Sequence, residues 1–165
     1  MDSARQIDSC SKVPEGFFER IVRAASLAPS GDNLQPWSFA LENDSLLIRH
    51  DPTQDRSLFN VRHLASYIAL GAAIENIKIA AAGMHHRVKI DYFPHGDDHE
   101  VVGRISFTAG GEPSPLEAAL EQRCTNRRPY EVGAIRPEIL SSLHSADDFP
   151  RSRLFWVSEP ALLDR

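Results

Sequence analysis

The chain has 165 residues, a net charge of −5, 42% hydrophobic residues and 25% charged residues. This length accommodates one domain with a buried core, and the composition is typical of a globular protein rather than a disordered one. The acidic balance argues against a general nucleic-acid-binding or membrane-binding surface, because such surfaces need a basic face. A small local anion site is still compatible with it.

The N-terminus and the cysteines favour a cytoplasmic protein. The opening segment, MDSARQIDSCSK, is polar and contains no apolar signal core. Cys10 and Cys124 are far apart and form no CxxC pair, which is typical of a reducing compartment. The apolar stretch 64–82 is interrupted by the charged Glu75 and Lys78, so it predicts a buried helix rather than a membrane span.

The first predicted elements are a helix and a hairpin. Residues 13–28 predict a helix, because Pro14 suits its first position and apolar residues then recur at helical spacing until Pro29. The segments WSFALEN and SLLIRHD flank Asn43–Asp44, which predicts a β-hairpin with a two-residue turn.

A long central helix is predicted next, at residues 61–84. Its small side chains permit close approach of another helix, and Gly83 is expected to close it. The remaining predictions are strands at 87–94 and 101–110, a short helix at 114–123, a helix at 136–146 and a strand at 152–159.

The connection LAPSGDNLQPWSF, residues 27–39, carries more hydrogen-bonding side chains than a turn requires. Ser30, Asp32, Asn33 and Gln35 gather within six residues. One interpretation is structural: a proline ends the helix, the Gly-Asp-Asn sequence turns the chain, and a second proline starts an edge strand. The other is that these side chains and the exposed amides face a polar, planar ligand.

A second polar segment is EQRCTNRRPY, residues 121–130. It places Arg123, Arg127 and Arg128 close together around Thr125 in an otherwise acidic chain. Guanidinium and hydroxyl groups suit a phosphate, because arginine donates bidentate hydrogen bonds. The alternative interpretation is a solvated basic turn.

Metal and nucleotide motifs are not evident. The histidines of MHHRV and HGDDHE lack the spacing of a catalytic metal site and are predicted to lie in surface turns. The sequence contains no nucleophile elbow, Walker loop or GxGxxG motif.

The two polar segments resemble signatures of one family, the FMN-dependent nitroreductases, and in particular its single-chain branch of NAD(P)H nitroreductases with two fused halves. The family sequence Ala-Pro-Ser-x-x-Asn-x-Gln-Pro-Trp is matched from Ala28 to Trp37. Its phosphate motif Arg-x-Ser-x-Arg is matched by Arg123, Thr125 and Arg127, with threonine in place of serine.

The resemblance implies an α+β, nitroreductase-like fold, with a central antiparallel-rich sheet flanked by helices and a long central interface helix. Residues 1–122 correspond to a first nitroreductase-like half. Residues 123–165 are expected to be the start of a second half, which the resemblance implies is truncated. A faint internal echo agrees with this, because Pro14-Glu15 and Pro137-Glu138 each open a predicted helix that precedes a tryptophan-containing strand.

The resemblance also implies one FMN site, with NAD(P)H as the electron donor and a small-molecule nitro- or quinone-type acceptor. Because the flavin supplies the chemistry, we name no catalytic residue. Trp37 is expected to serve packing, and Gln35 to hold the loop as well as line the site. The predicted cofactor-binding residues are Pro29, Ser30, Asn33 and Gln35 around the ring, and Arg123, Thr125 and Arg127 around the phosphate.

A homodimer through residues 61–84 is expected, with no nucleic acid and no membrane as partners. The fragment alone is expected to bind flavin weakly or not at all, and to be inactive. Two alternatives remain: a flavin-binding or flavin-sequestering protein with little turnover, and a plain interaction domain in which the loop and the arginines are structural.

Overall fold

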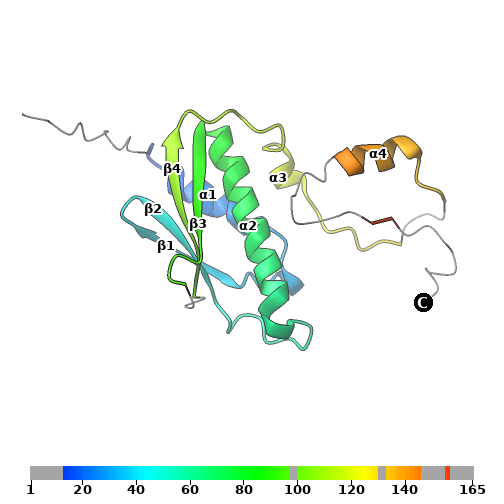
Figure 1. Ribbon diagram of the computed structural model, residues 1–165, viewed down its shortest axis with the longest axis horizontal. Helices are drawn as coiled ribbons and strands as arrows, with labels where there is room; N and C mark the ends of the chain where they lie inside the picture. Colours follow the sequence, from blue (N-terminus) through cyan, green and yellow to red (C-terminus); the bar gives the residue numbers. More distant parts are fainter. Residues whose placement is uncertain (1–12, 97–99, 130–132, 146–154, 157–165) are drawn as a thin grey trace, which may run out of the picture. The chain divides into compact units, whose positions relative to one another are not determined.

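The computed structural model describes residues 13–96, 100–129, 133–145 and 155–156 (Figure 1). Contacts divide the chain into two compact units, Met1–Thr125 and Asn126–Arg165, and each is described by itself. The first unit contains a four-stranded antiparallel sheet and a long helix. The predicted α+β class, with an antiparallel sheet and a long helix, is confirmed.

The sheet of the first unit has the strand order β1-β2-β4-β3, and every neighbouring pair is antiparallel. The elements of this unit are α1 (Phe17–Ser26), η1 (Gly31–Asn33), β1 (Trp37–Glu42), β2 (Ser45–His50), η2 (Val61–His63), α2 (Leu64–Gly83), β3 (His86–Tyr92), β4 (Val101–Ala109) and α3 (Ala119–Gln122), where η marks a 3-10 helix. The described part of the second unit contains α4 (Pro137–Ser145).

The predicted hairpin is confirmed as β1 and β2. Asn43 and Asp44 connect the strands with φ angles of 47° and 59°. Two central residues with positive φ form the turn whose twist matches that of the flanking strands, and asparagine and aspartate tolerate this conformation better than other side chains. The turn fixes the register, so that Trp37 faces His50 across the pair.

The two faces of the sheet differ in chemistry. One face carries apolar side chains, including Phe39, Ile48 and Ile105, which pack in the core with α1 and α2. The opposite face carries polar pairs. The guanidinium of Arg104 lies 2.9 Å from the carboxylate of Glu42, and the hydroxyls of Ser45 and Ser106 lie 3.2 Å apart. In the described part of the chain the helices therefore cover one face of the sheet.

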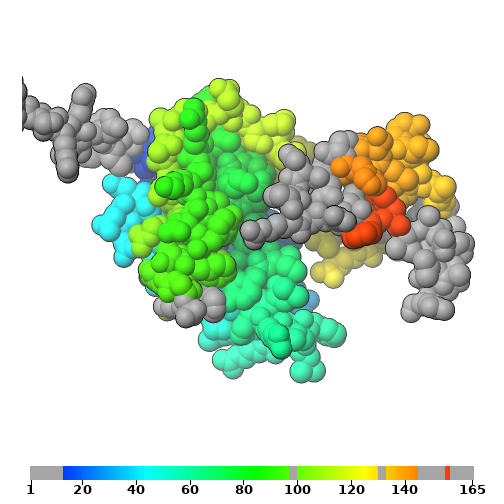
Figure 2. Space-filling view, viewed as in Figure 1, coloured from blue at the N-terminus to red at the C-terminus, as the bar shows by residue number. Residues whose placement is uncertain are grey.

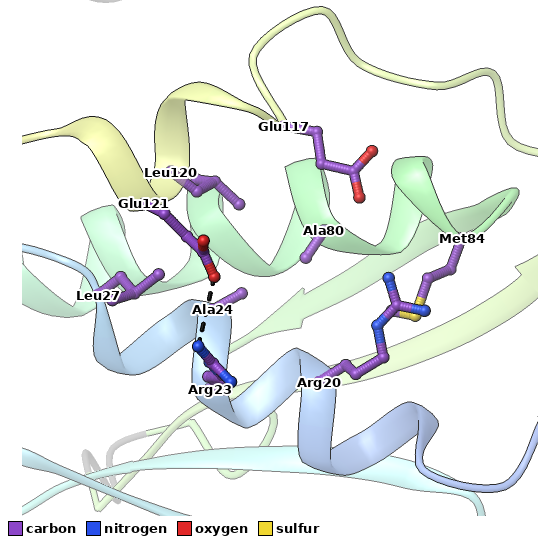
Figure 3. Close-up of a pocket in the computed structure, with 9 residues that line it drawn as sticks. All are labelled: Arg20, Arg23, Ala24, Leu27, Ala80, Met84, Glu117, Leu120 and Glu121. Carbon is purple, nitrogen blue, oxygen red and sulfur yellow. Dashed lines mark hydrogen bonds and ion pairs between the residues drawn. The ribbon is translucent and has the colours of Figure 1, made fainter.

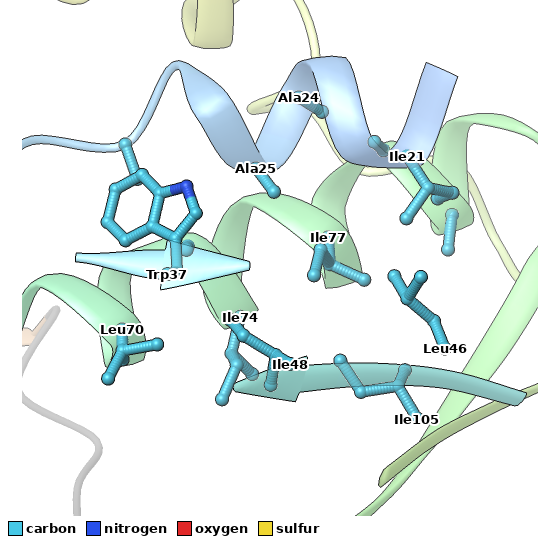
Figure 4. Packing of buried hydrophobic residues seen from close by; sticks show 14 of the residues in the cluster. Ile21, Ala24, Ala25, Trp37, Leu46, Ile48, Leu70, Ile74, Ile77 and Ile105 are labelled. Carbon is cyan, nitrogen blue, oxygen red and sulfur yellow. The ribbon is translucent and has the colours of Figure 1, made fainter. Parts of the chain in front are cut away.

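Side chains from α1, α2 and the sheet meet in the core (Figure 4). Ile21 of α1, Ile77 of α2 and Ile105 of β4 are fully buried. Burying each such side chain stabilises the fold by about 1.5–3 kcal/mol before conformational entropy is counted. The segment Val61–Gly83 is long and apolar enough to cross a membrane, but its buried side chains pack here against the sheet and α1.

The helix starts differ from the predictions. The first helix begins at Phe17 rather than at residue 13, because Gly16 adopts φ 74° and the amide of Phe17 bonds the carbonyl of Pro14 in a preceding turn. The long helix begins at Leu64 rather than at residue 61, since Arg62 and His63 have φ angles of 52° and 59°.

The helix ends also need correction. Gly83 does not supply the left-handed residue after the long helix, which is His85 with φ 57°. Gly83 is instead the last residue of α2, where a Cβ atom would overlap the carboxylate of Glu117. The helix predicted at 114–123 is a series of turns followed by α3, because the amides of Glu117, Ala119 and Leu120 bond carbonyls three residues back.

Only part of the structure predicted for the second unit lies within the described residues. The helix predicted at 136–146 is confirmed as α4. Of the strand predicted at 152–159, only Phe155 and Trp156 lie within the described residues, and neither is in a strand. Cys10 lies outside the described residues, whereas Cys124 is a free, exposed thiol.

Candidate functional site

The polar loop after α1 is held by hydrogen bonds among its own residues. The amide nitrogen of Gln35 donates to Oγ of Ser30 at 3.0 Å, and its side-chain Nε2 donates to the carbonyl of Ser26 at 3.1 Å. Gln35 thereby joins the end of α1 to the last turn of the loop. These bonds explain two of the polar side chains by loop construction, and they engage the side-chain donor of Gln35 within the chain.

Three loop residues have left-handed backbone conformations: Asp32, Asn33 and Gln35, with φ angles of 47°, 58° and 50°. Aspartate and asparagine tolerate this region, but for glutamine it costs about 1–2 kcal/mol. The hydrogen bonds of Gln35 offset that cost. The loop therefore has a defined conformation that presents Asp32 and Asn33 to solvent.

Part of the predicted ring site lines a cavity. Pro29, Ser30 and Gly31 face the first half of α2 across a space of about 290 Å³. The helix contributes the apolar side chains of Ala65, Ile68, Ala69 and Ala72. Asn33 and Gln35 do not line this cavity. Trp37 lies in the core with 8% of its surface exposed, as expected for a packing residue.

The predicted phosphate residues are divided between the two units. Arg123 and Thr125 belong to the first unit and Arg127 to the second, and all three side chains are exposed. In the first unit Nη2 of Arg123 donates to the carbonyl of Leu27 at 3.3 Å. Arg123 thus contacts the C-terminal end of α1, two residues before Pro29.

The position of Arg123 depends on the short helix that precedes it. Figure 3 shows a pocket of about 250 Å³ between α1, the end of α2 and the segment that contains α3. Leu120 packs against the core there, and Arg23 lies 3.4 Å from Glu121. Both charged side chains are mostly exposed, so this ion pair contributes at most about 1 kcal/mol. The apolar contact of Leu120 therefore does more to dock α3 and place Arg123 near Leu27.

Comparison with known proteins gives distant relatives of greater length. No family model matches the chain. It is 32% identical over 141 residues to the uncharacterized protein MT1398 of Mycobacterium tuberculosis, a match that covers 81% of this chain and 19% of that protein. It is 25% identical over 126 residues to the uncharacterized protein Rv3127 of Mycobacterium tuberculosis, covering 70% and 36%. The chain thus spans between 19% and 36% of the length of these curated relatives.

The similar solved structures are nitroreductase-family proteins. One is an FMN-dependent nitroreductase from Clostridium difficile R20291, with 14% identity, a TM-score of 0.47, and coverage of 70% of this chain and 90% of that one. Another is a nitroreductase family protein from Clostridium difficile 630, with 15% identity, a TM-score of 0.49, and coverage of 69% and 83%.

The structure also contains a polar cavity that the sequence analysis did not identify. It has a volume of about 660 Å³ and lies where β2 ends and α2 begins. His50, His63 and Tyr67 line it. One sequence signal could have indicated it: His50 occupies the core-facing register of β2 after Leu46 and Ile48, where an apolar residue is expected.

Two groups in this cavity, His50 and Asp51, have shifted pKa values. Burial lowers the pKa of His50 below 6.5, the nearby His63 lowers it further, and Asp51 acts in the opposite direction. The pKa of the Asp51 carboxyl is lowered mainly because the side chain and the backbone amide of Thr53 donate hydrogen bonds to it. His50 is therefore a neutral, buried imidazole near pH 7.

Proposed function

We propose that the protein is an FMN-dependent oxidoreductase of the nitroreductase family that passes electrons from NAD(P)H to a nitro- or quinone-type acceptor. The observation that supports it most is the hydrogen bond from Arg123 to the carbonyl of Leu27. It brings the first arginine of the phosphate-type motif to the start of the Pro-Ser-x-x-Asn loop, although the two motifs are distant in the sequence.

The loop and α2 fit one edge of a flat cofactor. In the cavity between them the helix wall is apolar, whereas the loop side carries the hydroxyl of Ser30. Gly31 leaves open space, since a Cβ atom there would meet only Asp55 Oδ2, at 3.9 Å. An apolar wall opposite a polar loop is the arrangement that binds and orients a planar ring with hydrogen-bonding edges. Pro29 and Ser30 would contact the ring, and Asn33 would approach its edge from the exposed side of the loop.

The arginines would hold the phosphate. Arg123 uses one guanidinium nitrogen on Leu27 and is otherwise exposed, so it retains donors for an anion. Thr125 and Arg127 follow at alternate positions and would complete the site. Bound FMN would supply the hydride and electron transfer between NAD(P)H and the acceptor. The chain's part is to bind the phosphate, orient the ring and limit water on its apolar side.

The proposal extends to a longer protein with two fused nitroreductase-like halves. Residues 1–122 would form the first half, and residues 123–165 would begin the second. The shares of the Mycobacterium tuberculosis relatives that this chain covers support a longer whole. For this chain alone we expect weak flavin binding or none, and no turnover.

The test is FMN binding and reduction by the full-length protein. Arg123→Ala and Arg127→Ala should each weaken FMN binding by ~1.5–3 kcal/mol, the value of a charge-assisted hydrogen bond. Arg128→Ala is the matched control, because Arg128 is next to the motif but outside it, and it should leave the affinity unchanged. The affinity is measured by quenching of flavin fluorescence.

Three outcomes separate the functions. Bound flavin that NAD(P)H reduces, and that a nitroaromatic or quinone reoxidises, supports the enzyme. Bound flavin that NAD(P)H fails to reduce contradicts the enzyme and indicates a flavin-sequestering protein. A full-length protein that binds no FMN contradicts both and leaves the interaction domain.

We also propose that this chain forms a homodimer through residues 61–84. Leu64 and Ile68 of α2 are 63% and 67% exposed, and Leu58 and Phe59 just before it are 93% and 94% exposed. Figure 2 shows the start of α2 at the uncovered surface of the first unit. A second copy would bury this apolar patch, whose exposure is costly in water. Light scattering should give a dimer, and Ile68→Glu should give a monomer, whereas Lys89→Glu on β3, an exposed position outside this segment, is the control. A wild-type monomer contradicts the proposal.

A further inference from the structure

The cavity at the end of β2 is built by elements that are distant in the sequence. His50, Asp51 and Pro52 leave the strand, His63 and Tyr67 belong to η2 and α2, and Ser38, Arg49 and Glu100 complete the lining. Its volume of about 660 Å³ lies within the range of small-molecule sites, roughly 300–1,000 Å³. The residues predicted to hold the flavin do not line it.

Aromatic rings form one wall of this cavity. The ring centroid of His50 lies 4.9 Å from that of His63 and 5.2 Å from that of Tyr67. Phe93 lies behind Tyr67, with its centroid 6.2 Å away in an edge-to-face arrangement. Such ring clusters favour a flat aromatic ligand, because edges and faces of the rings can extend the same packing to it.

A buried polar atom on this wall has no partner. His50 is 7% exposed, and its Nε2 makes no hydrogen bond within the residues that the structure describes. An unsatisfied buried polar atom costs about 1–3 kcal/mol, which a ligand hydrogen bond would recover. Because the imidazole is neutral near pH 7, Nε2 serves as a donor or an acceptor according to the tautomer.

The charged groups of the lining already have partners, although Nε of Arg49, like Nε2 of His50, is buried and makes no hydrogen bond within the described residues. Asp51 accepts hydrogen bonds from the amide and hydroxyl of Thr53 at 2.9 and 2.6 Å, and a third from Gln54 at 3.2 Å. The guanidinium of Arg49 lies 3.6 Å from the carboxylate of Glu100. A charged ligand would have to compete with these partners, so the cavity favours an uncharged ligand that also offers a hydrogen-bond acceptor to Nε of Arg49.

A metal ion fits this site poorly. Among the described residues, no three histidine, cysteine, aspartate or glutamate side chains are grouped to hold a metal ion. The two imidazoles pack edge to face, and the carboxylate of Asp51 is engaged by Thr53.

We propose that this cavity is a second ligand site, separate from the flavin site, that binds an uncharged planar aromatic carboxamide between the His50–His63–Tyr67 wall and the loop at Pro52. The carboxamide supplies both a donor and an acceptor, so it satisfies Nε2 of His50 in either tautomer. The aromatic ring packs against His63 and Tyr67.

The test titrates the chain with three probes of nearly the same shape and different charge: benzamide, benzoate and benzamidine. Histidine side-chain ¹H–¹⁵N spectra monitor His50 Nε2 directly. Benzamide should shift this resonance saturably, with a dissociation constant on the order of millimolar for so small a ligand. Benzoate and benzamidine should each bind at least roughly tenfold more weakly, because a charged group there would have to displace existing partners.

Two variants and a control locate the site. His50→Phe keeps an aromatic ring but removes the hydrogen bond, and should weaken benzamide binding roughly three- to tenfold. Tyr67→Ala removes part of the wall and should weaken it by a similar factor or more. His95→Phe changes an exposed histidine outside the cavity and should have no effect. Circular dichroism checks that each variant is folded.

Several results would overturn the proposal. These are no saturable shift of His50 with benzamide up to its solubility limit, equal or tighter binding of benzoate or benzamidine, and unchanged benzamide affinity in a folded His50→Phe variant. Stoichiometric Zn²⁺ binding that His50→Phe abolishes would replace it with a metal site. None of these measurements involves flavin, so their failure is independent of the proposed oxidoreductase function.

Discussion

The loop at residues 28–37 and the cavity at His50 are both polar regions at the surface of one sheet-and-helix unit, but they are built in different ways. The loop is held mostly by hydrogen bonds between residues at most nine positions apart, as between Ser26 and Gln35, with one longer bond from the Asp51 amide to the Pro36 carbonyl at 3.1 Å. The cavity joins the end of a strand to the start of a helix, from His50 to Tyr67 and on to Glu100. Residues that bond to one another locally form a continuous motif that is visible in the sequence. Residues that the tertiary structure brings together are scattered along the chain.

The largest expected effect is a loss of stability when a core side chain next to the cavity is shortened. Ile48 is fully buried two residues before His50, and Ile48→Ala should lower the free energy of unfolding by about 2–5 kcal/mol through the space left behind. Leu41→Ala is the control, because Leu41 lies on the same sheet face but is 58% exposed. Urea unfolding measures both. A loss at Ile48 no larger than that at Leu41 would show that β2 does not anchor the cavity.

A smaller effect is expected in the loop. Ser30→Ala removes the acceptor for the half-buried amide of Gln35 and should lower the free energy of unfolding by about 0.5–1.5 kcal/mol. Hydrogen exchange at the Gln35 amide should accelerate, while the His50 side-chain resonances stay unchanged. Leu34→Ala provides the control, since Leu34 is 36% exposed and its backbone φ of −71° suits alanine. A shift at His50 in the Ser30 variant would mean that the two regions are coupled.

The smallest effect concerns pH. The folded-state pKa of His50 lies below 6.5, so the unfolded chain binds more protons as the pH falls from 6.5 toward that lower value. The free energy of unfolding should therefore be greatest above pH 6.5 and decline as the pH falls through this window. The other charged or histidine side chains that line the cavity with His50 are His63, Asp51 and the ion pair of Arg49 with Glu100.

His50→Phe should flatten this pH dependence, and His95→Phe should preserve it. Unfolding curves above and below pH 6.5 measure the difference. An equal slope in the wild type and in His50→Phe would assign the pH dependence to other groups.

Much of the fold followed from local patterns in the sequence. The Asn43–Asp44 turn and its flanking alternation defined the hairpin, because a two-residue turn fixes both the pairing and the faces of its strands. The apolar run from Leu64 defined the long helix. The helix ends were less predictable, since Arg62, His63 and His85 adopt left-handed conformations that their residue types do not indicate.

The sequence by itself also predicted the residues of the candidate flavin site, because its two motifs are short and continuous. Only the tertiary structure decided that Arg123 reaches the end of α1, since that contact depends on how Leu120 packs α3 against the core. The cavity at His50 was likewise decided by tertiary structure. His50, His63 and Tyr67 form one wall of the cavity only because β2 and α2 pack together. The spacing of these residues in the sequence does not predict that wall.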